Sequence, residues 1–185
     1  MEGTALPLDD AIARARGGEV AAFGLIYERY SRPIHNYAQR ILGHAAEADD
    51  ITQETFLRAF QNVSKLRDDS RLESWLYSIA SNLCFDLLRR RKLLSWLPLK
   101  QEHEEQAAKS DFMGLMAEGE LVQKALSKMP PKYAACLVLR TVEGFSCEEI
   151  ADILKISKGA VWTRLSRARE MFCKSYDELT RGNVS

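Results

Sequence analysis

Three carboxylates stand close together in the 185-residue chain, and side chains of this type can do chemistry. They are Asp49, Asp50 and Glu54. Neighbouring carboxylates can hold a divalent metal ion for hydrolysis or phosphoryl transfer. A single acidic cluster, however, is usually the solvated start of a helix, where the helix dipole favours negative charge. We therefore expect no catalytic residue, no metal site and no cofactor in this stretch.

The same acidic stretch is better suited to binding another protein. At helical spacing, one face of residues 47–63 is apolar and is expected to be core: Ile51, Thr55, Ala59 and Val63. Asp49, Asp50, Gln53 and Leu57 point elsewhere, with Phe60 beside them. An exposed leucine among acids and an amide is typical of a protein-binding surface.

A second candidate site is the arginine-rich stretch "ISKGAVWTRLSRAREMF", residues 156–172. At helical spacing its core stripe is Val161, Leu165, Ala168 and Phe172. The opposite side and its flanks hold Trp162, Thr163, Arg164, Ser166 and Arg167. Arginines read guanine edges in the major groove and hydroxyls bond bases or phosphates, although a solvated helix face is the alternative.

The segment before this helix favours DNA binding over the solvated face. A short helix is expected within residues 146–156, where Ser146 and Glu149 have the spacing of a capping box. The small residues 157–159 then form a turn into the arginine-rich helix. Helix, turn and helix in this order are the layout of a helix-turn-helix motif.

The expected helix over residues 72–92 carries two stripes. One is apolar and should be core: Leu72, Leu76, Ile79, Leu83 and Leu87. The other is mixed and leads into a basic run at residues 89–92: Trp75, Ser78, Asn82, Phe85 and Arg89. Aromatic and amide groups can stack on and bond unpaired bases while cations hold phosphates. Alternatively, Trp75 and Phe85 simply pack against other helices.

All these sites lie on expected helices, because apolar residues recur three and four apart and no strand-like alternation is present. The first helix should run from about Glu19 to Ile41, be kinked or split by Pro33, and stop at Gly43. Further helices are expected over 47–63, 72–92, 146–156 and 159–172, with a polar loop at 64–74. A helical stretch over 121–142 is interrupted by Pro130 and Pro131. The predicted fold is all-α, with two small helical domains at 1–95 and 119–180. An acidic flexible linker, 96–118, joins them.

Composition excludes several classes of protein. The chain is 46% hydrophobic and 28% charged, which is typical of a globular protein. It has no apolar run of about 20 residues and no signal pattern, so we expect a cytoplasmic protein with no direct membrane insertion. The four cysteines are far apart, so they should be reduced thiols. Net charge is zero, but residues 123–185 hold eleven basic against seven acidic side chains.

Four motifs follow one another as they do in a known family. They are "AAFGLIYERYSRPIHNYAQRILG", "EADDITQETFLRAF", "SWLYSIASNLCFDLLRRRK" and "FSCEEIADILKISKGAVWTRLSRARE". Over about residues 17–175 the chain resembles bacterial group IV, or extracytoplasmic function (ECF), sigma factors of the sigma-70 family. The resemblance implies an all-helical subunit that binds core RNA polymerase and directs it to promoters. It implies no enzymatic activity.

The resemblance also assigns roles to residues. The residues that would dock on the clamp helices of the polymerase beta-prime subunit, beside the beta subunit, are Asp49, Asp50, Gln53, Glu54 and Leu57. The loop 65–74 would contain the pocket for a base of the minus-ten element. The residues that would contact this element and the opened strand are Leu66, Arg67, Trp75, Ser78, Asn82, Arg89 and Arg90. The minus-thirty-five element would be read by Lys158, Trp162, Thr163, Arg164, Ser166 and Arg167.

Relatives of this kind are usually held inactive by an anti-sigma factor, so such a partner is expected here. Trp162 and Ser166 depart from the residues common at their positions, so the promoter sequence does not follow from the resemblance.

Two other functions remain open at this point. One is a regulator with a helix-turn-helix output domain and an N-terminal ligand-receiving module, which would bind its operator tightly without polymerase. The other is an enzyme acting on nucleic acid, for which the chain lacks a convincing catalytic set. A gel shift with and without core polymerase distinguishes the first from a sigma factor.

Overall fold

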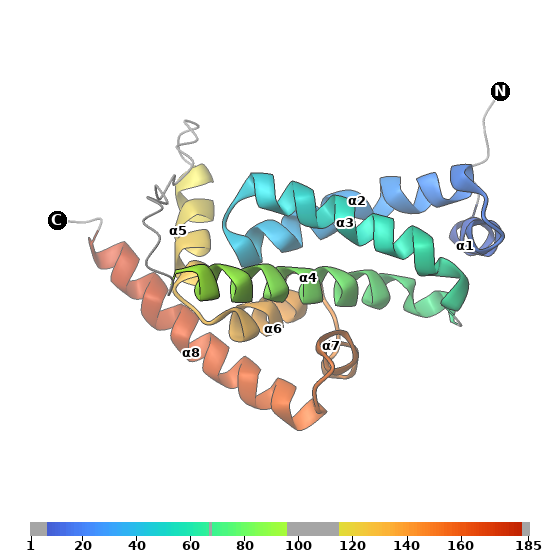
Figure 1. Ribbon diagram of the computed structural model, residues 1–185. Coiled ribbons are helices and arrows are strands. Elements are labelled where there is room, and N and C mark those ends of the chain that lie inside the picture. Colours follow the sequence, from blue (N-terminus) through green and yellow to red (C-terminus); the bar gives the residue numbers. More distant parts are fainter. Residues whose placement is uncertain (1–6, 67, 96–114, 183–185) are drawn as a thin grey trace.

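The computed structural model describes residues 7–66, 68–95 and 115–182, and every regular element in these ranges is a helix (Figure 1). The all-α prediction is therefore confirmed. Most of the expected linker, 96–114, lies outside the described residues. Its last four residues, 115–118, already belong to a helix.

The N-terminal unit contains four helices and two short 3-10 turns. They are α1 (Leu8–Arg16), α2 (Val20–Leu42), α3 (Ala45–Asn62), η1 (Val63–Lys65), η2 (Asp69–Arg71) and α4 (Leu72–Leu94). Helix α1 was not expected, because nine residues are too few for a clear period. It buries only Ala11, Ile12 and Ala15.

Helix α2 passes through Pro33 without being split. A proline removes one backbone hydrogen bond from a helix. Its neighbours Tyr30, Ile34 and Tyr37 are all buried in the core. Their packing holds the helix together across the missing bond, since tertiary contacts supply most helix stability in proteins. Gly43 ends the helix as expected, with a left-handed φ of 78°.

The C-terminal unit contains α5 (Leu115–Ser127), α6 (Pro131–Thr141), α7 (Cys147–Leu154) and α8 (Lys158–Gly182). The predicted capping box of α7 is confirmed: Ser146 Oγ accepts a hydrogen bond from Glu149 N at 3.2 Å, and Glu149 Oε2 accepts one from Ser146 N at 2.8 Å. Helix α8 continues to Gly182, ten residues beyond the end expected at Phe172.

The two units share one continuous hydrophobic core. In Figure 1, α4 lies between α2 and α3 on one side and α6, α7 and α8 on the other, and it contacts α7 directly. The Tyr77 ring on α4 packs edge-on against Tyr37 of α2 at 5.3 Å and against Phe145 of the C-terminal unit at 5.0 Å. Sequence periodicity gave no indication of this contact between the units.

The predictions for thiols are largely confirmed. Cys84, Cys136 and Cys147 are buried free thiols, and Cys173 is an exposed one. Burial raises the pKa of Cys84 to about 12, which makes this thiol unreactive at neutral pH. In the described ranges, no helix is long and apolar enough to span a membrane. The same ranges contain no group of three metal-ligating side chains.

Candidate nucleic-acid interface

A cavity of about 620 Å³ opens where α3, the loop after it and α4 meet. Four of the residues predicted for the minus-ten element line it: Leu66, Trp75, Ser78 and Asn82. Arg67 lies outside the described residues. Polar and cationic neighbours in the N-terminal unit also line it: Arg58, Asn62, Lys65, Asp68, Arg71 and Ser74. Helix α7 and the residue that ends it add Asp152, Ile153 and Lys155. A concave site with an aromatic ring, an amide and nearby cations can hold an unstacked base next to its phosphate.

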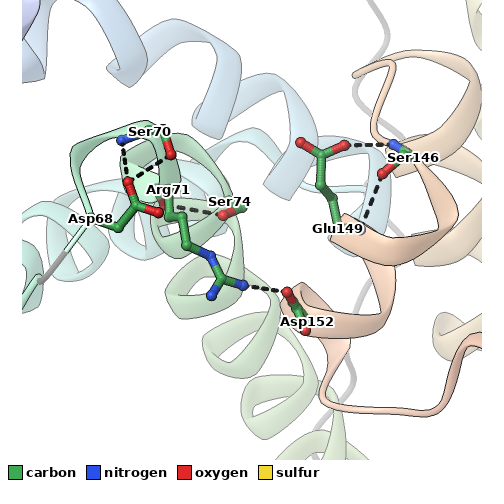
Figure 2. Close-up of polar contacts among 7 residues, drawn as sticks. All are labelled: Asp68, Ser70, Arg71, Ser74, Ser146, Glu149 and Asp152. Carbon is green, nitrogen blue, oxygen red and sulfur yellow. Dashed lines mark hydrogen bonds and ion pairs between the residues drawn. The ribbon is translucent and has the colours of Figure 1, made fainter.

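Short local hydrogen bonds shape the loop that borders this cavity (Figure 2). Asp68 Oδ1 accepts from Ser70 N at 3.1 Å and from Ser70 Oγ at 2.7 Å. These bonds to the Ser70 side chain and backbone lower the pKa of Asp68. Ser74 Oγ donates to the Arg71 carbonyl at 3.0 Å. An ion pair between Arg16 and Asp69 ties the loop to α1.

The two aromatic rings of the mixed stripe on α4 are not free. Trp75 and Phe85 are half-buried and pack against the hydrophobic core. The alternative prediction, that these two rings pack against other helices, is therefore confirmed in part. Trp75 also lines the cavity, whereas Phe85 does not.

The basic end of α4 is only partly free. Arg89 pairs with Asp86 at 2.8 Å, and Arg91 pairs with Glu47 of α3. Burial lowers the pKa of Arg91, and its contact with Glu47 joins two helices. Arg89 and Arg90 are exposed, but neither lines the cavity. They lie further along α4 than the cavity, so the minus-ten set is split between a pocket and a helix end.

The helix-turn-helix motif is present in α7 and α8. Lys155 ends α7 in the left-handed conformation, with φ 52°. Ser157 Oγ then accepts a hydrogen bond from Ala160 N at 3.2 Å, which caps the start of α8. Val161 and Leu165 are buried as predicted, while the Trp162 side chain on the other face is 60% exposed. Helix α8 is thus fixed at its N-terminal end, which is the part of a recognition helix that contacts bases in helix-turn-helix proteins.

The other residues predicted to contact the minus-thirty-five element differ in how exposed their side chains are and in whether they have a partner within the protein. Thr163 and Ser166 are exposed, although Thr163 Oγ1 donates to the Gly159 carbonyl at 3.0 Å. Lys158 pairs with Glu148 of α7. Arg164 is half-buried and lies beside the Cys136 thiol of α6, so it faces the protein more than solvent.

Arg167 is exposed but is not isolated. A hydrogen bond from Arg167 lowers the pKa of the Tyr133 hydroxyl on α6. Sequence reasoning missed this partner, because it placed Arg167 opposite the core stripe without considering the neighbouring helix. Arg167 therefore lies near α6 as well as on the exposed face of α8.

The acidic surface of α3 is exposed as predicted. Asp49, Asp50, Gln53 and Leu57 are exposed and Glu54 is half-buried. Two of the acids have partners: His35 Nε2 lies 3.0 Å from Asp49 Oδ1, and Arg58 Nε lies 2.6 Å from Glu54 Oε1.

An apolar patch continues from this surface. The exposed fractions of Leu57 and Tyr27 are 52% and 44%, and Phe60 is also exposed. The Tyr27 ring packs edge-on against Phe56 at 4.9 Å. Tyr27 lies on α2, so its exposed ring extends the patch onto a second helix.

Comparison with known proteins decides the family. Residues 26–93 match the family model described as Sigma-70 region 2, and residues 119–172 match Sigma-70, region 4. The chain is 32% identical over 181 residues to the ECF RNA polymerase sigma factor SigW of Bacillus subtilis, covering 91% of this chain and 96% of that protein. The chain belongs to the ECF RNA polymerase sigma factors. The sigma factor is accordingly a transcription initiation factor and not an enzyme.

Solved structures of sigma factors have the same fold. CnrH, solved in complex with the cytosolic domain of CnrY, has a TM-score of 0.69 and 25% identity, over 91% of this chain and 96% of its own. RpoE of Bartonella quintana, solved in complex with the anti-sigma factor NepR, has a TM-score of 0.67 and 21% identity, over 85% of this chain and 98% of its own. The match of residues 26–93 to sigma region 2 contradicts the alternative of a ligand-receiving N-terminal module.

Proposed function

We propose that this ECF sigma factor docks on core RNA polymerase through the exposed face of α3 and reads the two promoter elements with separate units. The docking surface comprises Asp49, Asp50, Gln53, Glu54 and Leu57, extended by Tyr27 and Phe60. Its mixture of acids and exposed apolar side chains suits a protein partner with basic and apolar groups. The polymerase beta-prime clamp helices are the proposed partner, with the beta subunit beside them.

The minus-ten element is read by the N-terminal unit. The observation that carries this proposal is the cavity in which Leu66, Trp75, Ser78 and Asn82 come together from a loop and a helix. A base flipped out of the non-template strand would stack on the ring and bond the amide. Arg89 and Arg90, further along α4, are placed to hold phosphates of the opened strand. Arg67 in the bordering loop is assigned to the same element.

The minus-thirty-five element is read as duplex by α8. Trp162, Thr163, Ser166 and Arg167 provide the exposed face, and Lys158 sits at the first turn. Arg164, half-buried beside Cys136, is the member least able to reach a base edge. We therefore assign Arg164 to a phosphate contact rather than to base reading.

We further propose that the protein works in the cytoplasm, where it meets polymerase, and that an anti-sigma factor controls it. CnrH was solved in complex with the cytosolic domain of CnrY, and RpoE in complex with the anti-sigma factor NepR. A partner of this kind would cover the polymerase- and DNA-binding faces named above.

Run-off transcription tests the proposal. Purified protein is added to sigma-free core polymerase on a library of bacterial promoters, and the transcripts are sequenced. Defined transcripts that require the protein and share minus-ten and minus-thirty-five sequences are expected. A library that gives the same transcripts with and without the protein would refute the function.

A further inference from the structure

We propose that the exposed indole of Trp162 selects thymine at one position of the minus-thirty-five element, by covering the C5 methyl group of that base in the major groove. This inference rests on the proposed function, because it names the base that one residue of the α8 face reads. Its starting point is exposure. Of the large hydrophobic side chains that the structure describes on α8, Trp162 alone is exposed, although burial of so large a ring is strongly favourable.

The surface of α8 on either side of the ring is open. One turn before Trp162 lies Gly159, and a methyl group placed there would meet no side chain within 4 Å, that of Trp162 included. One turn after Trp162 lies Ser166, which is small and exposed. Neither residue therefore blocks the approach of a base edge to the indole.

The polar side chains next to the ring are already bonded within the protein. Lys158, four residues before Trp162, forms an ion pair with Glu148 of α7. Thr163, the next residue, donates its hydroxyl hydrogen to the Gly159 carbonyl at 3.0 Å. At this end of α8 the indole is therefore the side chain best able to contact a base directly.

The charge around the ring favours DNA as its occupant over an apolar protein surface. Residues 156–169 contain no acidic side chain and four basic ones: Lys158, Arg164, Arg167 and Arg169. Cations that surround an exposed ring attract the phosphates on either side of a base pair. An apolar groove on a protein partner would not require this excess of positive charge.

Thymine is the base whose major-groove edge matches an indole. It alone carries a methyl group there, beside the O4 acceptor. Tryptophan offers an apolar ring and one N–H donor, and it has no acceptor. The ring can cover the methyl group while the N–H group donates to O4. Cytosine presents an N4 amino donor and no methyl group, so a donor would face a donor. The expected preference at this position is therefore for thymine over cytosine.

The first test replaces thymidine by deoxyuridine, which lacks only the C5 methyl group. Each thymine of the minus-thirty-five element, in a promoter mapped by run-off transcription, is replaced in turn, and holoenzyme binding is measured by a competition gel shift. With wild-type protein we expect one replacement to weaken binding about fourfold, the effect of leaving one methyl group uncovered. Trp162→Ala should bind the thymine and uracil promoters equally. Trp162→Phe should retain the methyl effect, because an apolar ring remains.

The second test places cytosine at the same position. Wild-type holoenzyme should bind this promoter more weakly than the thymine promoter, and 5-methylcytosine should recover part of the loss because it restores the methyl group. Trp162→Ala should not respond to this methyl group. The control is Val142→Ala, which removes an exposed apolar side chain at the end of α6 and should keep the wild-type response to both methyl groups. Unchanged circular dichroism of each variant excludes misfolding as the cause.

Three results would overturn the inference. An element without thymine on either strand would leave the ring no methyl group to cover. An equal loss of affinity by Trp162→Ala on every promoter, with or without the methyl group, would place the ring against the sugar–phosphate backbone. Wild-type affinity of Trp162→Ala on every promoter would assign the ring to a protein partner.

Run-off transcription with core polymerase separates these results from failure of the proposed function. If the wild-type protein initiates transcription but shows no methyl effect that depends on Trp162, only the role of this residue is wrong. If the wild-type protein does not initiate at all, the proposed function is wrong.

Discussion

Arg16 in the last turn of α1 forms an ion pair with Asp69 of η2, two residues that are 53 positions apart in the sequence. Each side chain is less than a third exposed. The contact fastens the loop that borders the minus-ten pocket to a helix that has no direct part in that pocket. Helix α1 also packs along α2 and against η1. The first helix thus supports the position of the loop that we propose binds a minus-ten base.

Replacing Arg16 by glutamine should loosen this loop. We expect a loss of about 1 kcal/mol in the free energy of unfolding, since the pair is only partly buried. Opening of the minus-ten region, measured by permanganate reactivity of unpaired thymines, should fall more than binding of the closed promoter. The matched control is Arg14→Gln, which breaks a pair with Glu19 near the same helix end. Equal effects of the two variants on opening would contradict the role of Arg16.

The docking surface is tested by Asp50→Ala, Gln53→Ala and Leu57→Ala together. All three side chains are exposed, so the fold should survive and the circular dichroism should not change. Association with core polymerase should be lost in co-purification. The control is Asp177→Ala with Glu178→Ala, two exposed acids near the end of α8. A folded triple variant recovered with core polymerase at wild-type yield would refute the assignment.

Asn82→Ala should impair promoter opening by roughly tenfold, about 1.4 kcal/mol, with little effect on closed-complex formation. The reason is its exposed amide in the cavity wall, where it can bond an unstacked base. Permanganate footprinting and a gel shift measure the two steps. Gln61→Ala removes an exposed amide of α3 outside the cavity and should affect neither step. Normal opening by Asn82→Ala would show that this amide does not contact the base.

Arg167→Ala should cost about 1–3 kcal/mol in promoter binding if the guanidinium reads a base edge, and should relax preference at one minus-thirty-five position. An even loss across sequences, with a salt slope reduced by about one, would indicate a phosphate contact instead. Wild-type affinity and salt dependence on every promoter variant would place Arg167 outside the interface.

The same substitution has a readout in the free protein. A hydrogen bond from Arg167 lowers the pKa of Tyr133, so the wild-type phenol should lose its proton at a lower pH than in Arg167→Ala. Ultraviolet titration of phenolate absorbance, with Tyr133→Phe to identify the signal, checks this order. An unchanged titration curve would contradict the contact.

The capping box gives a prediction for stability. Ser146→Ala removes the acceptor for Glu149 N and should cost about 1 kcal/mol. For a chain of this size that corresponds to a decrease in Tm of about 3 °C. Ser146→Thr keeps the hydroxyl and should recover most of the loss. If the alanine and threonine variants unfold alike, the cap does not stabilise α7.

Core faces could be predicted from the sequence because helical periodicity is local. Ile51 and Thr55 of α3 are buried as expected. The buried Thr55 hydroxyl has a hydrogen-bond partner within its own helix, because Oγ1 donates to the Ile51 carbonyl at 2.7 Å. The stripe of α8 was predicted equally well, with Val161 and Leu165 buried. In each case one helix and its own spacing were sufficient.

The contacts between distant segments could not be predicted in this way. Tyr77 is buried because Phe145 and Glu143 of the other unit cover it, and no pattern within its own helix records that. The spacing placed Arg167 opposite the core stripe and Arg164 at its flank, but it did not indicate that each lies beside a different residue of α6. Such pairings depend on how whole helices pack, which a periodic pattern does not encode.

The hydrophobic core that continues from α1 to α8 has a consequence for how the chain melts. Because the two units bury Tyr77 and Phe145 against each other, neither can unfold without exposing apolar surface of its neighbour. Calorimetry of the free protein should therefore show one heat-absorption peak whose van't Hoff and calorimetric enthalpies agree. Phe145→Ala should divide that peak in two, as each half of the chain becomes its own cooperative unit.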